Sequence, residues 1–215
     1  LFVGTHDGHL QTWDTRNQSV IDMRSLSSSI EMIVVSASGR YFLSITADRR
    51  ATVWLAGNRD VLYEFQLDDR ITDAAFSPDE RFIVAGTEQG NAMVWDMKTG
   101  VPIASVRHDS KVRSVSISPD SGLLFTGSDD NTAILWNIRT GLPVMPPFQH
   151  LDIVRRVEFS PDGQLALTGS DDNYVRVWRV PRRGHDAPHD LDLEVEILTG
   201  NDARDSYLPF KKLSL

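Results

Sequence analysis

The stretch Thr126-Gly127-Ser128-Asp129-Asp130-Asn131, with Trp136 after it, returns as Thr168-Gly169-Ser170-Asp171-Asp172-Asn173, with Trp178 after it. The chain contains five tryptophans, spaced at intervals of 41, 41, 41 and 42 residues. They are Trp13, Trp54, Trp95, Trp136 and Trp178. A fixed period of this length is typical of repeat architectures, in which each unit buries its apolar face against its neighbours. The chain is therefore predicted to be an array of five related units.

Each unit contains short apolar runs separated by turn residues. In the turn Ser118-Pro119-Asp120, proline fixes φ at the second position of a type I turn and aspartate suits the third. Leu123-Leu124-Phe125 follows this turn, and Thr140-Gly141 marks a later turn that leads to Leu142-Pro143-Val144. Short runs bounded by Gly, Pro, Asp and Asn are typical strands. Four antiparallel strands per repeated unit predict an all-β fold, a β-propeller of four-stranded blades.

The units resemble WD repeats, which are named for a dipeptide present here as Trp13-Asp14 and Trp95-Asp96. The dipeptide is degenerate in the other units, which read Trp54-Leu55, Trp136-Asn137 and Trp178-Arg179. The resemblance covers roughly residues 1–180 and rests on the Ser-Pro-Asp, Thr-Gly-Ser-Asp-Asp and Trp elements together. We therefore expect propeller blades over residues 1–180, a polar linker over 181–190 and a separate C-terminal segment over 191–215.

The resemblance also implies a hydrogen-bonded set of His, Ser or Thr, Asp and Trp that joins adjacent strands. Carried over by position, the two sets are His108, Thr126, Asp130, Trp136 and His150, Thr168, Asp172, Trp178. The histidine and the aspartate precede the tryptophan by the same spacing in both units, which predicts one shared geometry. Leu26 and Leu67 take the histidine position in the second and third units, and Gln89 replaces the aspartate in the third.

The same residue types could form a nucleophile, a base and an orienting acid. A structural role is favoured, because the set occurs twice at identical spacing and an active site is not normally copied from blade to blade. Its expected task is to satisfy buried polar groups that would otherwise cost roughly 1–3 kcal/mol each. We therefore expect no catalytic residues here, and any catalysis in a domain upstream of Leu1.

Composition narrows the function classes. The net charge of −8 argues against a nucleic-acid binder, which normally presents a basic face. The absence of cysteine excludes thiol catalysis, disulfides and cysteine-based zinc sites, and fits a cytoplasmic location. No apolar run approaches the ~18 residues that span a bilayer, so no membrane association is expected. No cofactor and no metal are expected. His185-Asp186 and His189-Asp190 could hold a divalent cation, but a solvated linker is the favoured interpretation.

The two ends of the array depart from the repeat. Leu1-Phe2-Val3 matches the second strand of a blade, so the first unit is expected to be incomplete and the chain to belong to a larger propeller. Either further blades precede Leu1, which is favoured, or residues 191–198 return to complete the first blade. Residues 191–198 alternate apolar and acidic, which favours an edge strand, although Gly200 would also suit the end of a short helix. Residues 201–215 are predicted to be a mobile tail.

Within the family, the usual docking surface is the face that bears the histidine loop and the Asp-Asp turn. On this chain that face would present Asp69, Arg70, Glu88, Lys111, Arg113, Asp129, Arg155 and Asp171. Mixed charges around a central channel suit recognition of a protein or peptide. The sequence therefore predicts a non-catalytic protein-interaction scaffold, with its oligomeric state left open. The alternatives are a propeller enzyme with a site in the central channel and, less favoured, a nucleic-acid binder.

A further resemblance concerns the source of the array. The run from Gly141-Leu142-Pro143-Val144 to Ser160-Pro161-Asp162-Gly163 is similar to repeat arrays in large bacterial proteins. In those proteins the propeller is often joined to an N-terminal serine/threonine kinase or a signalling ATPase. Val195-Glu196-Ile197-Leu198-Thr199-Gly200 is similar to the end of some kinase-linked arrays. This resemblance implies a docking or sensing arm of a larger signalling protein.

Trp136 provides a test of the repeat register. A buried tryptophan removes a large apolar surface from water, so Trp136→Ala is expected to lower the free energy of unfolding by ~3–5 kcal/mol. Urea denaturation of the variant and of the unaltered chain measures the difference. An unchanged urea midpoint would show that the register of the repeats is misassigned.

Overall fold

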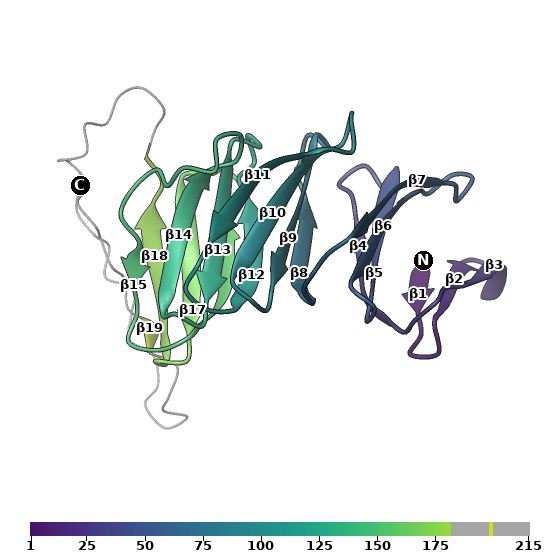
Figure 1. Cartoon of the computed structure of the whole chain (residues 1–215), viewed down its shortest axis with the longest axis horizontal. Helices are drawn as coiled ribbons and strands as arrows, with labels where there is room; N and C mark the ends of the chain where they lie inside the picture. The colour runs from purple at the N-terminus through teal and green to yellow at the C-terminus, as the bar shows by residue number, and fades with distance from the viewer. Residues whose placement is uncertain (182–197, 200–215) are drawn as a thin grey trace.

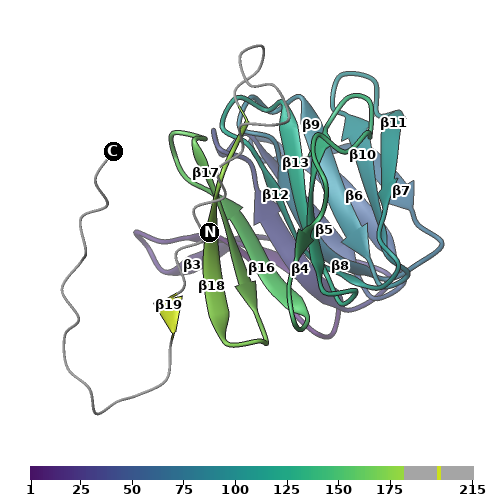
Figure 2. The same ribbon diagram turned by 90° about the vertical axis from the view of Figure 1, so that its left-hand side faces the viewer.

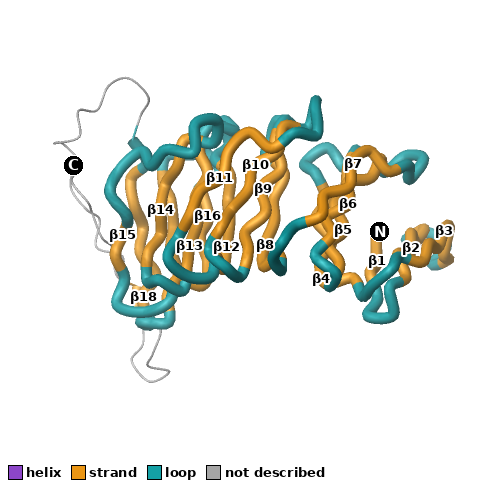
Figure 3. The backbone as a smooth tube through the Cα atoms, in the orientation of Figure 1, coloured by secondary structure: helices purple, strands orange, loops and turns teal. Residues whose placement is uncertain are grey.

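The computed structural model describes residues 1–181 and 198–199 of the chain. The described part consists of strands joined by turns and contains no helix (Figure 3). It therefore includes no helical segment of the length and apolar character needed to cross a membrane. The strands form five antiparallel sheets that follow one another in chain order (Figure 1).

The strands have the following bounds. The first sheet holds β1 (Phe2–Gly4), β2 (His9–Asp14) and β3 (Ser19–Ser25). The second holds β4 (Ile30–Val35), β5 (Tyr41–Thr46), β6 (Arg50–Leu55) and β7 (Val61–Gln66). The third holds β8 (Ile71–Phe76), β9 (Phe82–Thr87), β10 (Asn91–Asp96) and β11 (Pro102–Arg107). The fourth holds β12 (Val112–Ile117), β13 (Leu123–Ser128), β14 (Thr132–Asn137) and β15 (Phe148–Gln149). The fifth holds β16 (Val154–Phe159), β17 (Leu165–Ser170), β18 (Tyr174–Arg179) and β19 (Leu198–Thr199).

This arrangement confirms the predicted fold class. Each of the last four sheets pairs its strands antiparallel in sequence order, and each tryptophan lies on the third strand of its unit. The first sheet has three strands, and β1 takes the place that the second strand has in the other sheets. The first and fifth sheets lie at opposite ends of the row, so the described residues form a partial propeller (Figure 1).

The Ser-Pro-Asp turns form as the sequence predicts. In the fourth sheet, the Ser118 hydroxyl donates to the carboxylate of Asp120 at 2.6 Å and accepts the N–H of Leu123 at 2.9 Å. Ser121, which follows the aspartate, adopts a left-handed φ of 57°. One serine side chain therefore holds both ends of the turn between β12 and β13, and this fixes the register of the two strands.

The fourth strand of the fourth sheet lies later than predicted. The expected run at residues 142–144 does pair with β14: Leu142 accepts the N–H of Asn137 at 2.9 Å and Val144 donates to the carbonyl of Leu135 at 2.8 Å. Pairing stops after this single bridge between Pro143 and Trp136. The regular strand β15 is confined to Phe148–Gln149. Pro146 and Pro147 have no N–H to donate to a ladder, which explains why pairing is interrupted before β15.

The tryptophans carry the packing between sheets. Each one from the second unit onward packs into the sheet before it, as Trp136 does against Val94 and Val106 of the third sheet. These four indoles are at most 7% exposed. Trp13, on the first of the described sheets, is only half-buried. Figure 2 shows the opposite end of the row, where the strands of the fifth sheet lie in front.

The outer face of the fifth sheet is apolar. In the fourth sheet the positions equivalent to Leu165 and Val175 of the fifth are Leu123 and Ala133, and both are buried against the fifth sheet. In the fifth sheet Leu165 is 38% exposed and Val175 is 37% exposed. Described residues Leu198–Thr199 pair with Tyr174 and Val175 of β18, so this piece of the C-terminal segment extends the fifth sheet and does not pair with β1. The predictions for the linker beyond residue 181, its histidines and the remaining tail fall outside the described residues.

The innermost strands of neighbouring sheets are linked by side-chain hydrogen bonds. Thr72 on β8 donates its hydroxyl to the carbonyl of Val112 on β12 at 2.6 Å. The carboxylate of Asp73 accepts the N–H of Val115 at 2.9 Å. These bonds tie the third sheet to the fourth at its inner edge.

Close approach of the fourth and fifth sheets requires glycine at position 127 on β13. A Cβ on Gly127 would lie 2.8 Å from Val154 Cγ1 and 2.9 Å from Val157 Cγ1 of the fifth sheet. At Gly169, the same position of the fifth sheet, the nearest atom to such a Cβ is 3.9 Å away. The two glycines therefore occupy equivalent positions on β13 and β17, but a methyl group would clash at Gly127 and fit at Gly169.

This difference predicts a matched pair of substitutions. Gly127→Ala is expected to lower the free energy of unfolding by about 1–3 kcal/mol, because the added methyl overpacks the interface between sheets. Gly169→Ala is expected to be neutral or to stabilise by up to about 1 kcal/mol, because alanine restricts the unfolded chain. Urea midpoints of both variants test this. Equal losses would show that the fifth sheet is covered as fully as the fourth.

Candidate functional site

The fourth sheet contains the complete polar set that the resemblance implies. His108 contacts Asp130 through Nδ1 at 2.9 Å and Thr126 through Nε2 at 2.7 Å. The indole N–H of Trp136 donates to the Thr126 hydroxyl at 2.8 Å. With the proton on Nδ1, His108 donates to Asp130 and accepts from Thr126. The set therefore joins the loop after β11 to both β13 and β14.

The negative charge of this set lies on the carboxylate of Asp130. Burial by itself raises the pKa of the Asp130 carboxyl, but hydrogen bonds from His108 and Thr132 lower that pKa well below its usual range. Thr132 donates to the second carboxylate oxygen at 2.6 Å. The carboxylate is therefore ionised at neutral pH and fixes the orientation of the His108 ring.

The geometry of the set does not suit nucleophilic chemistry. Thr126 is fully buried and His108 is 2% exposed, so no substrate reaches the hydroxyl in this arrangement. The Thr126 oxygen is also held between the histidine and the indole. These side chains satisfy one another inside the sheet.

The fifth sheet departs from this geometry, and the prediction of one shared arrangement is wrong. Trp178 still donates to Thr168 at 3.0 Å. His150 Nδ1, however, lies 3.7 Å from the Asp172 carboxylate. Arg176 Nη1 contacts both, at 2.7 Å from His150 Nδ1 and 2.8 Å from Asp172. The guanidinium has inserted into the set.

The cause is one substitution within the repeat. Arg176 stands two residues before its tryptophan, where the fourth sheet has the buried Ile134. Arginine reaches the carboxylate and displaces the histidine from it. An alignment of the two repeats shows arginine in place of isoleucine at this position, and this difference could have predicted the altered set.

His150 is left neutral by its surroundings. Burial first, and then the positive charge of Arg176, lower the pKa of His150 to about 4. Within the described residues its Nε2 atom is buried and has no hydrogen-bond partner. A neutral imidazole that accepts from Arg176 at Nδ1 is the form that fits this contact.

The second and third units confirm that the set is incomplete there. In the second unit the Trp54 indole donates to Ser44 at 2.9 Å, and Ser44 takes the threonine position. In the third unit Ala85 takes that position and offers no acceptor to Trp95. Each unit thus keeps the tryptophan while the polar partners vary.

The eight residues of the predicted docking surface lie at one end of the sheets. They occupy the starts of the innermost strands or the turns before them, and the turns after β9, β13 and β17. Lys111 Nζ lies 2.9 Å from Glu88, and Arg70 Nη1 lies 3.5 Å from the same carboxylate. Arg70 also pairs with Glu31 of the second sheet at 2.7 Å. These contacts link three successive sheets.

The same end of the fourth and fifth sheets carries a repeated ion pair. Arg113 holds both oxygens of Asp129, with Nη2 at 2.7 Å, and Arg155 holds Asp171 with Nε at 2.8 Å. The hydrogen bond from Arg155 is the main cause that lowers the pKa of Asp171. Asp69 differs, because its carboxylate accepts backbone N–H groups of Arg70 and Gln89.

We call the eight predicted residues together with Glu31 the charged face. Sequence reasoning missed Glu31, although it stands at the same repeat position as Arg113 and Arg155. A depression of about 250 Å³ opens on this face and is lined by Glu31, Met32, Arg70, Ile71, Thr72, Glu88, Lys111 and Arg113. The face carries four basic and five acidic side chains, so it is mixed in charge and not basic.

A family model described as the nucleolar protein 10-like N-terminal domain, a β-propeller, matches residues 1–189. The chain belongs to this family. A search of curated proteins finds no match. Membership in this nucleolar protein 10-like family and the five sheets agree on a WD-repeat-like propeller. Membership in the family also supports a role in protein interaction, which propeller domains generally have. The family description names neither a bacterial source nor a kinase, so both stay predictions.

Within residues 1–181 and 198–199 of this nucleolar protein 10-like domain, no group of three or more His, Cys, Asp or Glu side chains could hold a metal. The candidate at His185 and His189 lies outside these residues. Nothing in the described part therefore adds a metal centre to the charged face or to the polar sets.

The lowered pKa of His150 predicts a pH dependence of stability. The unfolded chain protonates this histidine near pH 6.5, whereas the folded chain does so only near pH 4. The folded state is therefore destabilised as pH falls from about 6.5 to about 4, by up to about 3 kcal/mol, and no further below that. Urea midpoints at about pH 7 and about pH 5 measure the loss.

Two variants isolate the contribution of His150. His150→Leu places at this position the residue that the second and third units carry, and it should reduce the loss of stability between these pH values. His6→Leu makes the same change at an exposed site and should leave the loss as it is. If His150→Leu kept the full pH dependence, another group would have to be its source.

Proposed function

We propose that this chain is a non-catalytic protein-docking scaffold whose charged face binds a protein or peptide partner. The observation that carries the proposal is the series of ion pairs that repeats along one end of successive sheets. Lys111–Glu88 and Arg70–Glu31 join neighbouring sheets, and Arg113–Asp129 and Arg155–Asp171 repeat within them. These groups sit on turns and strand ends of a rigid scaffold, where binding residues concentrate.

Paired charges suit recognition more than stability. Exposed ion pairs contribute little to folding because water already solvates both partners. Arg155 and Asp171 hold each other in fixed positions while both remain partly accessible. A partner with the complementary order of charges gains orientation and a faster encounter from such a face.

The two rival functions have less support. An enzyme would need accessible reactive groups, but the only Thr-His-Asp grouping that closes in the described part is the buried set of Thr126. A nucleic-acid binder would need an excess of cations to contact phosphates. The charged face instead carries one more carboxylate than it has cations, within a chain of net charge −8.

A finer version of the proposal makes the propeller a docking or sensing arm of a larger signalling protein. Its support is the resemblance of residues 141–163 to bacterial repeat arrays that are joined to kinases or signalling ATPases. The cytoplasmic location likewise rests on the cysteine-free composition. The family description, in contrast, names a nucleolar protein.

A charge swap tests the docking role while preserving the fold. In the double variant Arg155→Asp/Asp171→Arg the ion pair remains and its order of charges is reversed. Capture of binding partners from the cell of origin, quantified by mass spectrometry, is compared with the unaltered chain. We expect the partners to be lost from the swapped variant, because the electrostatic match is reversed.

The control is Arg16→Glu, a charge reversal on the exposed turn between β2 and β3. It should retain the partners, and the urea midpoints of all three proteins should agree, since exposed ion pairs add little stability. Equal capture by the swapped variant and the unaltered chain would contradict docking through the charged face.

A further inference from the structure

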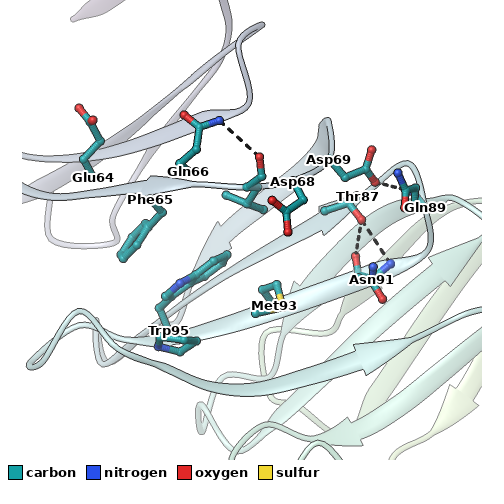
Figure 4. Close-up of a pocket in the computed structure, with 12 residues that line it drawn as sticks. Glu64, Phe65, Gln66, Asp68, Asp69, Thr87, Gln89, Asn91, Met93 and Trp95 are labelled. Atoms are coloured by element: carbon teal, nitrogen blue, oxygen red, sulfur yellow. Dashed lines mark hydrogen bonds between the residues drawn. The ribbon is translucent and has the colours of Figure 1, made fainter.

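A pocket of about 540 Å³ lies between the second and third sheets, beside the charged face (Figure 4). Its size falls within the ~300–1,000 Å³ range of ligand sites. The lining comes from β7, the loop after it, β9, β10, the turn between those two strands and the start of β11. The lining residues central to its chemistry are Glu64, Phe65, Asp68, Asp69, Met93 and Trp95.

The pocket coincides with the missing polar set of the third unit. Leu67, Gln89 and Trp95 line it, and they stand at the repeat positions of His108, Asp130 and Trp136. In the fourth sheet the His108 ring spans the distance between aspartate and threonine. The third unit lacks all three polar partners of its tryptophan, and an open space remains.

One side of the pocket is apolar and aromatic. The rings of Phe65 and Trp95 stack with centroids 4.9 Å apart and planes inclined by 26°. Met93 lies next to them (Figure 4). Trp95 is 5% exposed, and within residues 1–181 and 198–199 its indole N–H has no hydrogen-bond acceptor. The pocket thus combines an aromatic surface with an unused donor.

The other side is acidic. Glu64, Asp68 and Asp69 line it, and no lysine or arginine is among the lining residues. Glu64 is neutralised by Arg50 at 2.7 Å, and Asp69 accepts two backbone N–H groups. The exposed carboxylate of Asp68 has no partner within the described part of the chain. Asp68 therefore supplies an unpaired negative charge facing an aromatic surface.

We propose that this pocket binds a basic side chain, arginine or lysine, presented by a partner polypeptide. The cation pairs with Asp68 while its methylene stem and charged end pack on the Phe65–Trp95 surface, where cation–π attraction favours it. A backbone carbonyl of the same polypeptide accepts the Trp95 N–H. The net charge of −8 draws a basic segment toward this site. The inference shares with the proposed function the idea of a protein partner, but it does not depend on the charged face.

The Trp95 indole N–H is a local reporter of occupancy. In a nitrogen–proton NMR spectrum of the full chain, the five tryptophans give five indole signals, and the signal lost in Trp95→Phe assigns this one. The probe is an acetylated and amidated Gly-Ser-Arg-Ser-Gly peptide. Its control contains citrulline, which has nearly the same shape as arginine without the charge.

We expect the arginine peptide to shift the Trp95 signal saturably, with an affinity at least about fivefold higher than that of the citrulline peptide. Asp68→Asn should remove most of this difference. Glu158→Gln makes the same type of change at an exposed position on β16 and should leave binding as it is. Asp68 is exposed, so its substitution should not disturb folding.

Any of four results would overturn the proposal, and the first three concern the peptides. These are equal binding of the two peptides, unaltered binding to Asp68→Asn, or no shift of Trp95 at millimolar peptide. A short single-stranded oligonucleotide that shifts Trp95 more strongly than the arginine peptide would also overturn it, by pointing to base stacking. The swapped variant Arg155→Asp/Asp171→Arg should still bind the peptide. Failure of the pocket is therefore separable from failure of the charged face.

Discussion

The packing of each tryptophan into the preceding sheet is the interaction on which the rest of the structure depends. A four-stranded sheet of this size has two apolar faces and cannot satisfy them alone. The indoles of the last four units fill the gap between successive sheets, and each is almost completely buried. Where a hydroxyl stands ten residues earlier, as Thr126 does for Trp136, the antiparallel pairing of β13 with β14 brings the hydroxyl to the indole N–H. The ten-residue spacing between Thr126 and Trp136 thus provides the indole N–H with an acceptor while the indole packs between the sheets.

The polar set around the tryptophan is adjustable because the apolar contact already holds the sheets together. The fourth sheet completes the set, the fifth diverts it through Arg176, and the third omits it. Each variation has a chemical consequence. Insertion of Arg176 leaves His150 neutral, and the loss of histidine, threonine and aspartate beside Trp95 leaves a pocket with a donor that has no acceptor among the described residues. Differences between repeats are therefore where this scaffold acquires individual chemistry.

The period of the tryptophans and the Ser-Pro-Asp turns predicted the sheets and their strand order, because these depend on spacing along the chain. The set that is complete at Trp136 was implied by the resemblance to WD repeats. The position of β15 was missed because Pro146 and Pro147 interrupt the ladder after the expected place. The set at Trp178 was misjudged because matching residue types conceal a neighbour, Arg176, that is long enough to compete for the same carboxylate. Glu31 and the pocket involve two sheets at once, and repeat alignment treats units singly. The spacing of residues along the chain therefore predicts the strands and their order well, but it predicts the contacts between side chains of neighbouring units poorly.

The charged face depends in turn on how closely the sheets approach. A Cβ on Gly86 would lie 2.6 Å from Val112 Cγ1, so only glycine lets β9 and β12 come this near. Glu88 stands two residues after Gly86, and Lys111 immediately precedes Val112. The backbone contact that requires glycine is therefore the one that brings these two side chains within 2.9 Å across the boundary between sheets. Core packing therefore fixes the distances between the charges of the charged face. A partner that recognises the order of these charges also depends on the spacing of the sheets.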